Sequence, residues 1–379
     1  MPEGRLRITI YPDHSMIHDL KQPVVAFDAQ SLTGAGQTGL GVYARGIARA
    51  VQRHSDEVCI KLIWPKNRKP FRRTLERLIW GEAHLPSGAR KEGASVIHVP
   101  CFSAPRFTKI PVVVTAHDLI VLKHPHLMPP GSRWYFASWI PGSYKSADRI
   151  IAVSECTKND LVDFLDIPEE KITVIHHGVD SIYSSGRDRQ DVSVVREKYQ
   201  VDGEFFLMVG SFEPRKNVDR AIDAFAAIKD MPDTLKLVLV GKDSPHKGKM
   251  IEKASGLGLS ERISFPGYIP DSDISALLSI CTSFVFPSSA EGFGLPLLEA
   301  MNSGAPVIAS DLKVFREIAG DAAWYVPVGD TEALSASMRK MLDDAEFRSA
   351  LIRSGLERAK SFDCETAAMK TIEVYKSVV

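Results

Sequence analysis

Short apolar runs alternate with helical patterns along almost the whole chain, and this alternation restricts the fold more than any other feature. Runs rich in Val, Ile, Leu and Phe have the length of buried strands. Parallel strands need long crossovers, so strands that alternate with helices predict βα units. The predicted strands are 23–29, 58–63, 95–99, 111–115, 149–153 and 171–175, then 205–209, 236–240, 263–265, 283–286, 307–309 and 323–326. The predicted helices include 41–53, 157–164, 218–228, 271–279, 297–302 and 331–343.

The βα pattern stops once and then restarts. A length of 379 residues exceeds one ordinary core, and the segment 181–202 is polar and lacks strand character. We therefore predict an α/β protein with two doubly wound domains, 1–185 and 200–363, joined by a linker at 186–199. Ligands on such sheets bind beyond the carboxyl ends of the strands, so the site should lie in a cleft between the domains.

Composition excludes several classes of protein. The formal net charge is zero, which gives no electrostatic reason to expect nucleic acid as a partner. Five scattered cysteines without a CxxC pair predict reduced thiols in a cytoplasmic protein. The N-terminus lacks the apolar core of a signal peptide, and no window has eighteen apolar residues, so we expect no membrane span.

The segment 66–80 is strongly basic, because it contains six basic residues and one acidic residue, Glu76. Apolar residues, among them Phe71, Leu75 and Trp80, lie between the basic ones. Two readings stay open. The segment is either a solvated basic helix or a surface that rests on anionic lipid headgroups, where each basic residue contributes about 1 kcal/mol.

The run SSAEGFGLP leads from the strand 283–286 into a helix, and Pro296 suits the first turn of that helix. The amides of Phe293, Gly294 and Leu295 should then point out of a helix N-terminus, where an anion is favoured. Glycine allows a ligand to approach the backbone closely. This turn is therefore a candidate phosphate site.

Two glutamates stand on either side of this turn, with seven residues between them. Glu291 precedes the turn and should face the cleft, and Glu299 follows about one helical turn after its start. A carboxylate that accepts two hydrogen bonds from vicinal hydroxyls can hold a sugar or a ribose. The alternative is a capped helix with two exposed glutamates, which leaves the Gly-Phe-Gly sequence unexplained.

The run GSFEPRKN follows the strand 205–209, so it begins at a carboxyl end. Gly210 and Ser211 open the loop, and Asn217 is the predicted N-cap of the next helix. Arg215 and Lys216 supply a guanidinium fork and an ammonium where a diphosphate needs neutralising. An Arg-Lys pair in a loop is usually only an exposed surface feature. The position of this pair at a strand's carboxyl end makes it a candidate diphosphate site.

Three features of the first domain are less specific. The turn Gly39-Leu40-Gly41 lacks the spacing of GxGxxG, so it predicts close substrate approach or a plain turn rather than a dinucleotide site. His117 follows the strand 111–115 and can bond a sugar hydroxyl or phosphate oxygen, or simply local backbone. The pair His176-His177 has no third ligand at suitable spacing, so we expect no metal site.

Taken together, the runs EGFGLPLLEAM, GSFEPRKN, FPGYIPDSDISALL, SGAPVIASD, VSECTKNDL and IHHGVD resemble, in order, the blocks of one family. That family is the retaining family 4 glycosyltransferases with the GT-B fold, also described as glycosyl transferases group 1. The resemblance covers residues 24–363 and is strongest in the second domain. The opening FDAQSLTGAGQTGLGVYARGIARAV and the THDL block resemble mannosyltransferase-like members from bacterial polysaccharide and lipopolysaccharide pathways.

The resemblance implies a role for each matching residue. The position of Glu299 implies contact with the ribose hydroxyls of a nucleotide, and that of Glu291 implies contact with the donated sugar. Arg215 and Lys216, with the helix amides, would stabilise the diphosphate leaving group. The family pattern implies four catalytic residues, Glu291, His117, Arg215 and Lys216, and eleven binding residues, Glu299, Gly294, Leu295, Phe293, Gly210, Ser211, Tyr268, Ile269, Gly39, Leu40 and Gly41.

The implied reaction is transfer of a hexose from a nucleotide-sugar to a lipid-linked or growing glycan, with retained configuration and without metal or other cofactor. GDP-mannose is the expected donor, and a UDP-sugar for glucosyl, galactosyl or N-acetylglucosaminyl transfer is the alternative. The resemblance also implies that a last helix, about 364–379, packs back on the first domain. It places the protein in the cytoplasm, with a peripheral contact at the inner face of the membrane through 66–80. A Rossmann oxidoreductase and a non-catalytic sensor of sugar nucleotides remain as remote alternatives.

Overall fold

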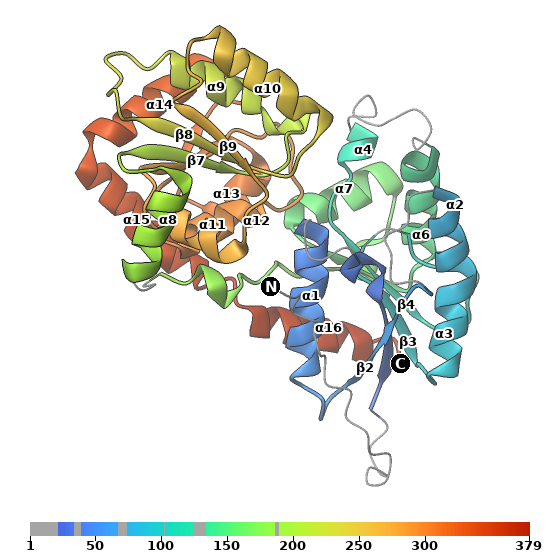
Figure 1. Cartoon of the computed structure of the whole chain (residues 1–379). Coiled ribbons are helices and arrows are strands. Elements are labelled where there is room, and N and C mark those ends of the chain that lie inside the picture. The colour runs from blue at the N-terminus through green and yellow to red at the C-terminus, as the bar shows by residue number, and fades with distance from the viewer. Residues whose placement is uncertain (1–21, 34–38, 67–73, 102, 124–133, 186–188) are drawn as a thin grey trace.

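The chain folds into two lobes, each built around a parallel sheet (Figure 1). The computed structural model describes residues 22–33, 39–66, 74–101, 103–123, 134–185 and 189–379. Each sheet contains six strands in a doubly wound order. The predicted α/β architecture is therefore confirmed.

The first sheet has the order β2-β1-β3-β4-β5-β6. Its strands are β1 (Val24–Asp28), β2 (Cys59–Ile63), β3 (Val96–Val99), β4 (Val112–Ala116), β5 (Arg149–Ala152) and β6 (Ile172–Val174). The strand order reverses between β1 and β3, and the loops after these strands diverge there. A ligand site is expected beside such a reversal.

Helices cover both faces of the first sheet. One face packs against α1 (Gly39–Gln52) and α16 (Cys364–Lys376), and Phe27 and Tyr375 are fully buried there. The other face packs against α3 (Leu85–Lys91), α6 (Ile140–Ser146) and α7 (Glu155–Leu165). Two short helices, α2 (Thr74–Ile79) and α4 (Ile120–Lys123), complete the lobe.

The second sheet has the order β12-β11-β10-β7-β8-β9. Its strands are β7 (Phe205–Val209), β8 (Lys236–Val240), β9 (Ile263–Gly267), β10 (Ser283–Phe286), β11 (Val307–Ser310) and β12 (Trp324–Val326). The order reverses between β7 and β10, which are hydrogen-bonded neighbours. The loops GSFEPRKN and SSAEGFGLP follow these two strands, so both motifs meet at the reversal.

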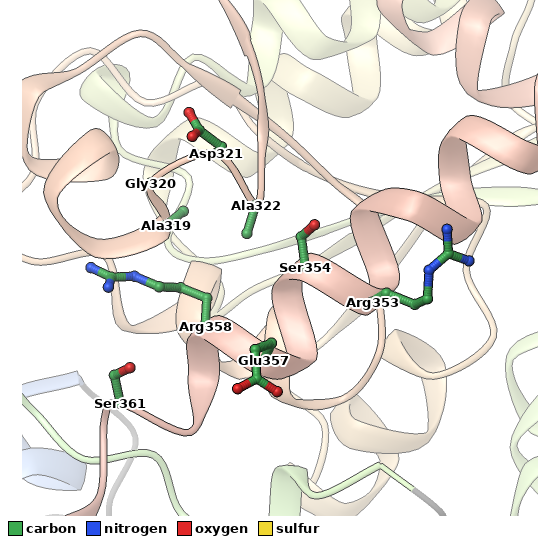
Figure 2. Close-up of a pocket in the computed structure, with 9 residues that line it drawn as sticks. All are labelled: Ala319, Gly320, Asp321, Ala322, Arg353, Ser354, Glu357, Arg358 and Ser361. Carbon is green, nitrogen blue, oxygen red and sulfur yellow. The ribbon is translucent and has the colours of Figure 1, made fainter.

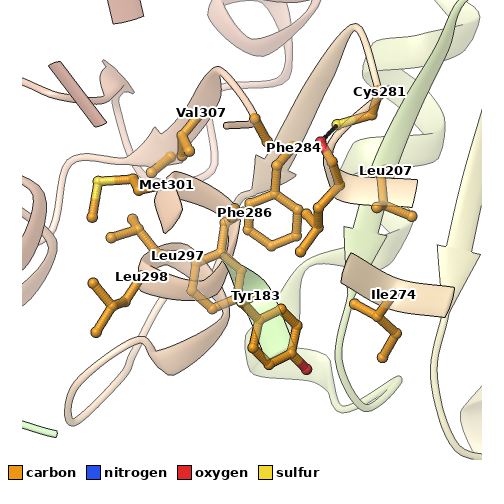
Figure 3. Close-up of a cluster of buried hydrophobic side chains, with 14 of the residues drawn as sticks. Tyr183, Leu207, Ile274, Cys281, Phe284, Phe286, Leu297, Leu298, Met301 and Val307 are labelled. Atoms are coloured by element: carbon orange, nitrogen blue, oxygen red, sulfur yellow. Dashed lines mark hydrogen bonds between the residues drawn. The ribbon is translucent and has the colours of Figure 1, made fainter. Parts of the chain in front are cut away.

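One face of the second sheet packs against α8 (Arg189–Tyr199), α11 (Asp271–Leu278), α12 (Leu295–Asn302) and α13 (Lys313–Ala319). Phe284 and Phe286 of β10 lie against Leu297, Leu298 and Met301 of α12 in this core (Figure 3). The opposite face packs against α9 (Val218–Ala226), α10 (Pro245–Gly256) and α14 (Thr331–Asp343). The core thus fixes α12 directly above the strand that precedes it.

The longest helix, α15 (Ala345–Ala359), lies at the edge of the second lobe. An open hollow of about 700 Å³ lies between this helix and the loop that follows α13 (Figure 2). Arg358 on its border donates to the carbonyl oxygens of Ile318 at 2.8 Å and Glu317 at 2.7 Å. This arginine therefore satisfies the C-terminal carbonyls of α13.

All the predicted strands are present, with ends that differ by no more than two residues. The segment predicted as a linker contains α8, which packs on α11 and buries Val195 in the core of the second lobe. The last helix, α16, crosses to the first lobe and lies beside α1 (Figure 1). None of the helices in the described ranges has the length and apolar character needed to cross a membrane.

Candidate active site

A compact ion cluster joins the two loops at the reversal of the second sheet. Glu291 accepts from Lys216 Nζ at 2.5 Å and from Arg215 Nη1 at 3.1 Å. Only 7% of Lys216 is exposed. Arg215 Nε also donates to Glu213 at 2.9 Å, so two carboxylates balance the two cations, and the cluster places both cations beside the cleft.

The protonation of this cluster follows from burial and pairing. Burial alone would raise the pKa of Glu291, but Lys216 and Arg215 outweigh it and the pKa falls below its usual value. Burial lowers the pKa of Lys216, and Glu291 offsets part of that effect. The pKa of Arg215 rises because Glu291 and Glu213 outweigh its burial. Glu291 is therefore ionised at neutral pH and is not a proton donor.

Backbone contacts hold the two loops together. Arg215 Nη1 donates to the carbonyl of Ala290 at 3.1 Å, and its own carbonyl accepts from the amide of Ser289 at 2.7 Å. Asn217 Nδ2 donates to the carbonyl of Pro287 at 2.8 Å. Asn217 stands at the N-cap position of α9 with φ 52°, but its side chain does not cap the helix. The predicted capping role was wrong, because the side chain bonds the neighbouring loop instead.

Helix α12 starts as predicted, with Pro296 in its first turn. Gly294 precedes it at φ 94°, and a Cβ added there would lie 2.8 Å from Cε1 of Phe315. Only glycine suits that backbone and that space. Among the described residues, no acceptor takes the amides of Gly294 and Leu295. These donors are thus available to an anion.

Glu299 lies in a small cavity between the lobes, with about 50 Å³ of room for water-sized molecules. Leu295 lines the same cavity, as do Tyr43 of α1 and Asp180. Only 8% of Glu299 is exposed, and its carboxyl has no hydrogen-bond partner in the part of the chain that the structure describes. Burial, then the charges of Asp271 and Asp180, raise its pKa to about 8. An uncompensated buried carboxyl facing a cavity suits a ligand that brings hydroxyl donors.

His117 reaches the same region from the first lobe. Its Nε2 lies 2.7 Å from the carbonyl of Pro100, so this nitrogen carries the proton. Burial lowers its pKa to about 4, and the imidazole is neutral at pH 7. Its ring contacts Tyr43 at 4.8 Å and His177 at 5.5 Å between centroids. The Nδ1 atom remains the unprotonated nitrogen, able only to accept.

The other predicted positions are placed as follows. Gly39, Leu40 and Gly41 form the first turn of α1 and not a loop before it, since the helix begins at Gly39. Residues 34–38 of the preceding loop lie outside the described ranges. Tyr268 is half exposed at the end of β9, and Ile269 beside it is buried. Gly210 and Ser211, which follow β7, are partly buried.

The histidine pair is used for packing and for a hydrogen bond between the lobes. His176 Nε2 lies 2.8 Å from Glu317 of the second lobe, and His177 packs edge-on against Phe293 at 4.5 Å. In the described part of the chain no group of three or more His, Cys, Asp or Glu side chains is arranged to hold a metal ion.

Comparison with known proteins gives the family. A model of glycosyl transferases group 1 matches residues 191–358, and a model of Glycosyltransferase Family 4 matches residues 38–181. The O-antigen chain mannosyltransferase B of Escherichia coli is 30% identical over 287 residues, which is 74% of each chain. This chain belongs to the family 4 glycosyltransferases.

Other relatives and solved structures agree with that assignment. The glycosyltransferase is 30% identical over 268 residues to the serotype-specific mannosyltransferase WbdA of Escherichia coli, of which the match spans 33%. HepE of Anabaena, solved in complex with UDP and glucose, superposes with a TM-score of 0.74 at 19% identity, covering 94% of this chain and all of HepE. WaaG, a glycosyltransferase involved in lipopolysaccharide biosynthesis, superposes with a TM-score of 0.74 at 20% identity, covering 93% of this chain and 99% of its own. The predicted GT-B fold is confirmed.

The large hollow between α13 and α15 is a poorer candidate for the donor site of this glycosyltransferase. It lies away from the sheet reversal, and Arg358 on its border is committed to backbone carbonyls. The smaller cavity at Glu299 has the buried, unpaired group and the flanking helix N-terminus that ligand binding needs. The chemical groups that line the cavity at Glu299, and not its volume, make it the better candidate site.

Sequence reasoning missed residues that act between the lobes. Glu317 of α13 accepts from the amide of Glu155 at 2.7 Å and of Cys156 at 3.2 Å, the first two residues of α7. Asp118 follows His117 and interacts electrostatically with Arg215. The position of Asp118 at a strand's carboxyl end was a usable signal. No local pattern marked Glu317, since its partners lie more than 160 residues away.

Proposed function

We propose that this glycosyltransferase moves a mannosyl unit from GDP-mannose onto a lipid-linked or growing polysaccharide or lipopolysaccharide glycan. Its similarity to O-antigen chain mannosyltransferase B supports the sugar and the kind of acceptor. The site supports the reaction class, because it combines cations for a diphosphate with carboxyls for hydroxyls. A UDP-sugar donor is the alternative that the test below distinguishes.

The observation that carries the proposal is the pairing of Lys216 and Arg215 with Glu291 beside the free amides of α12. Negative charge develops on the nucleoside diphosphate as the bond to the sugar breaks. Donors that are already in place stabilise that charge without reorganisation. The two cations of the cluster and the helix N-terminus act on the same leaving group.

The two glutamates take different roles in this account. Glu291 is ionised and held between two cations, so it accepts hydrogen bonds from hydroxyls of the donated sugar. Glu299 is buried without a partner, and the ribose hydroxyls of the nucleotide supply the donors that it lacks. Neither acts as the acid of a hydrolase, because Glu291 is ionised at neutral pH and Glu299 lies in the nucleotide cavity.

We propose retention of configuration, with attack from the face that the diphosphate leaves. The acceptor oxygen forms a bond to C1 as the bond from C1 to the phosphate oxygen breaks. The departing phosphate takes the proton of the acceptor hydroxyl. Lys216, Arg215 and the amides of Gly294 and Leu295 hold that phosphate, and we propose that they do so without a metal ion.

The remaining predicted residues border the donor. His117, through Nδ1, accepts from a sugar hydroxyl, and Tyr268 and Ile269 border the base. Gly210 and Ser211 line the approach to the diphosphate. Gly39, Leu40 and Gly41 start α1 opposite the second lobe, where a donor or acceptor meets the first lobe.

We also propose that the first lobe makes a peripheral contact with anionic membrane. Residues 67–73 of the basic stretch lie outside the described ranges. Beyond them, Leu75 is 64% and Ile79 47% exposed, and Trp134 is also exposed. Trp80 is not part of this surface: it is buried and donates through Nε1 to Asp28 at 2.9 Å. The expectation that Trp80 faces lipid was wrong, because its indole nitrogen satisfies a buried carboxylate.

The test is calorimetric titration of GDP, UDP and ADP into the protein in the presence of EDTA, followed by turnover of GDP-mannose and UDP-glucose. Binding of GDP alone, and release of GDP from GDP-mannose under EDTA, support the proposal. Binding of UDP with turnover of UDP-glucose selects the alternative donor. With a synthetic mannoside supplied as acceptor, proton NMR of the glycoside product gives its anomeric configuration, and an inverted product contradicts the proposed stereochemistry.

A further inference from the structure

One contact joins the lobes at the glycine turn of the site. Ser154, at the start of α7 in the first lobe, is fully buried, and its hydroxyl lies 2.7 Å from the carbonyl of Gly292 in the second lobe. Thr157 is also buried, and its hydroxyl lies 3.3 Å from the same carbonyl and from that of His117. These residues are 138 and 135 positions from Gly292 in the chain.

The hydroxyl of Ser154 has two tasks. Its oxygen accepts from the amide of Thr157 at 3.0 Å and so caps α7. Its single proton is then free to be donated, and the carbonyl of Gly292 is the nearest acceptor. One side chain therefore caps a helix of the first lobe and fixes a peptide group of the second.

We propose that Ser154 is a positioning residue that orients the peptide between Gly292 and Phe293 for the diphosphate. A trans peptide is planar, so its N–H points opposite to its C=O. With the carbonyl of Gly292 bound to the first lobe, the amide of Phe293 points away from that lobe's hydroxyl. No acceptor among the described residues takes this amide. It joins the amides of Gly294 and Leu295 as a donor only when the lobes are together.

The glycine at position 292 is required by this contact. A Cβ there would lie 1.9 Å from the carbonyl oxygen of His117 and 2.8 Å from Cβ of Asp118. Both neighbours belong to the first lobe, and one is backbone, so the lobes must separate to admit any side chain. Glycine is required at position 294 for a different reason, which is the positive φ of that residue. The two glycines around Phe293 thus have separate physical causes.

A second contact supports the same helix end. Glu317 accepts from the amides of Glu155 and Cys156 and from His176, so a carboxylate of the second lobe holds the N-terminus of α7. Separation of the lobes would leave both amides without that acceptor. Ser154 and Glu317 therefore couple closure of the lobes to completion of the donor set.

This inference rests on the proposed function, and kinetics of GDP-mannose hydrolysis test it. We expect Ser154→Ala to lower kcat about tenfold, since one charge-stabilising donor is misaligned. The affinity for GDP should change less than twofold, because the second lobe binds the nucleotide. Ser154→Thr keeps both cap and hydroxyl and should restore kcat. Asp330→Ala removes the cap of α14, where Asp330 accepts from Ala333, and is the matched control with unchanged kcat.

An unchanged kcat in Ser154→Ala would overturn the inference. So would an equal loss in Asp330→Ala, which would assign the effect to helix stability alone. Failure of the proposed function is a separate result, namely no turnover of GDP-mannose by the wild-type protein. In that case small-angle X-ray scattering with Gly292→Ala decides: a larger radius of gyration than wild type supports the contact, and an identical one contradicts it.

Discussion

The two lobes share one architecture but carry different chemistry at the edges that face each other. At the reversal of the second sheet lie Lys216, Arg215 and Glu291, an ion cluster that contributes two cations. Opposite them, the first lobe presents the packed rings of Tyr43 and His117. Cations and free amides suit a diphosphate, whereas neutral rings suit a sugar or glycan. In both lobes the strand order sets where a site can lie, and the loop residues decide which ligand it suits.

The largest effect should come from the second lobe. Lys216→Met removes the ammonium closest to Glu291 and leaves that carboxylate with one cation. We expect kcat for donor turnover to fall about 10²–10³-fold, as for the loss of one preorganised donor. Lys340→Met, which removes an exposed ion pair with Asp344, is the control and should keep wild-type turnover. Activity within threefold of wild type in Lys216→Met would remove the cluster from the mechanism.

The next largest effect should be on the affinity for GDP, which should depend on the second lobe and not on the first. Glu299→Ala removes the acceptor that we assign to the ribose, and we expect GDP to bind about 10–50-fold more weakly, since a buried donor left without its acceptor costs about 1–3 kcal/mol. His117→Leu, in the first lobe, should leave GDP affinity within twofold. Calorimetric titration measures both. Equal weakening in the two variants would show that the nucleotide is shared between the lobes.

The first lobe should matter for turnover rather than for nucleotide binding. His117→Leu is expected to lower kcat about tenfold through loss of an acceptor to the sugar. The pKa of His117 is lowered to about 4, so the imidazole stays neutral from pH 6 to 8. The pH profile of kcat/KM in that range should therefore be the same for wild type and variant. A step near pH 6.5 present only in wild type would contradict the assignment.

The smallest effect concerns stability. Burial raises the pKa of Glu299 from its ordinary value to about 8, so the folded protein holds a proton that the unfolded chain releases above about pH 4.5. The free energy of unfolding then decreases as pH rises from about 4.5 to 8 and is constant above. Glu299→Gln removes this loss, and its Tm should exceed that of wild type by a few degrees at pH 9. At pH 5 the two Tm values should converge, and a gap of equal size at both values would assign it to another cause.

Much of the fold and part of the candidate site could be predicted from the sequence, because the patterns that indicate them are local. Apolar runs predicted the strands. The loops that carry Arg215 and Glu291 follow two of these strands, so their place at one edge of the sheet could be predicted as well. The helix α8 was not predicted, since its composition is polar and its core contact rests on Val195. The roles of Trp80 and Asn217 depend on partners 52 and 70 residues away, which periodicity does not reveal.

The contacts between the lobes could not be predicted from the sequence either, because their partners are also distant in the chain. A serine before α7 predicts a cap, and the structure confirms that cap. The bond of its proton to Gly292 requires the relative placement of two sheets. Glycine in a turn suggested close approach of a ligand, whereas at Gly292 the approaching group is the backbone of His117.

A crystal structure of the protein with GDP tests the central claim most directly. We expect the diphosphate to lie within hydrogen-bond distance of Lys216, Arg215 and the amides at the start of α12. The ribose hydroxyls should reach Glu299. A diphosphate bound at any other place, such as the hollow between α13 and α15, or held by a divalent cation in place of these groups, would contradict it.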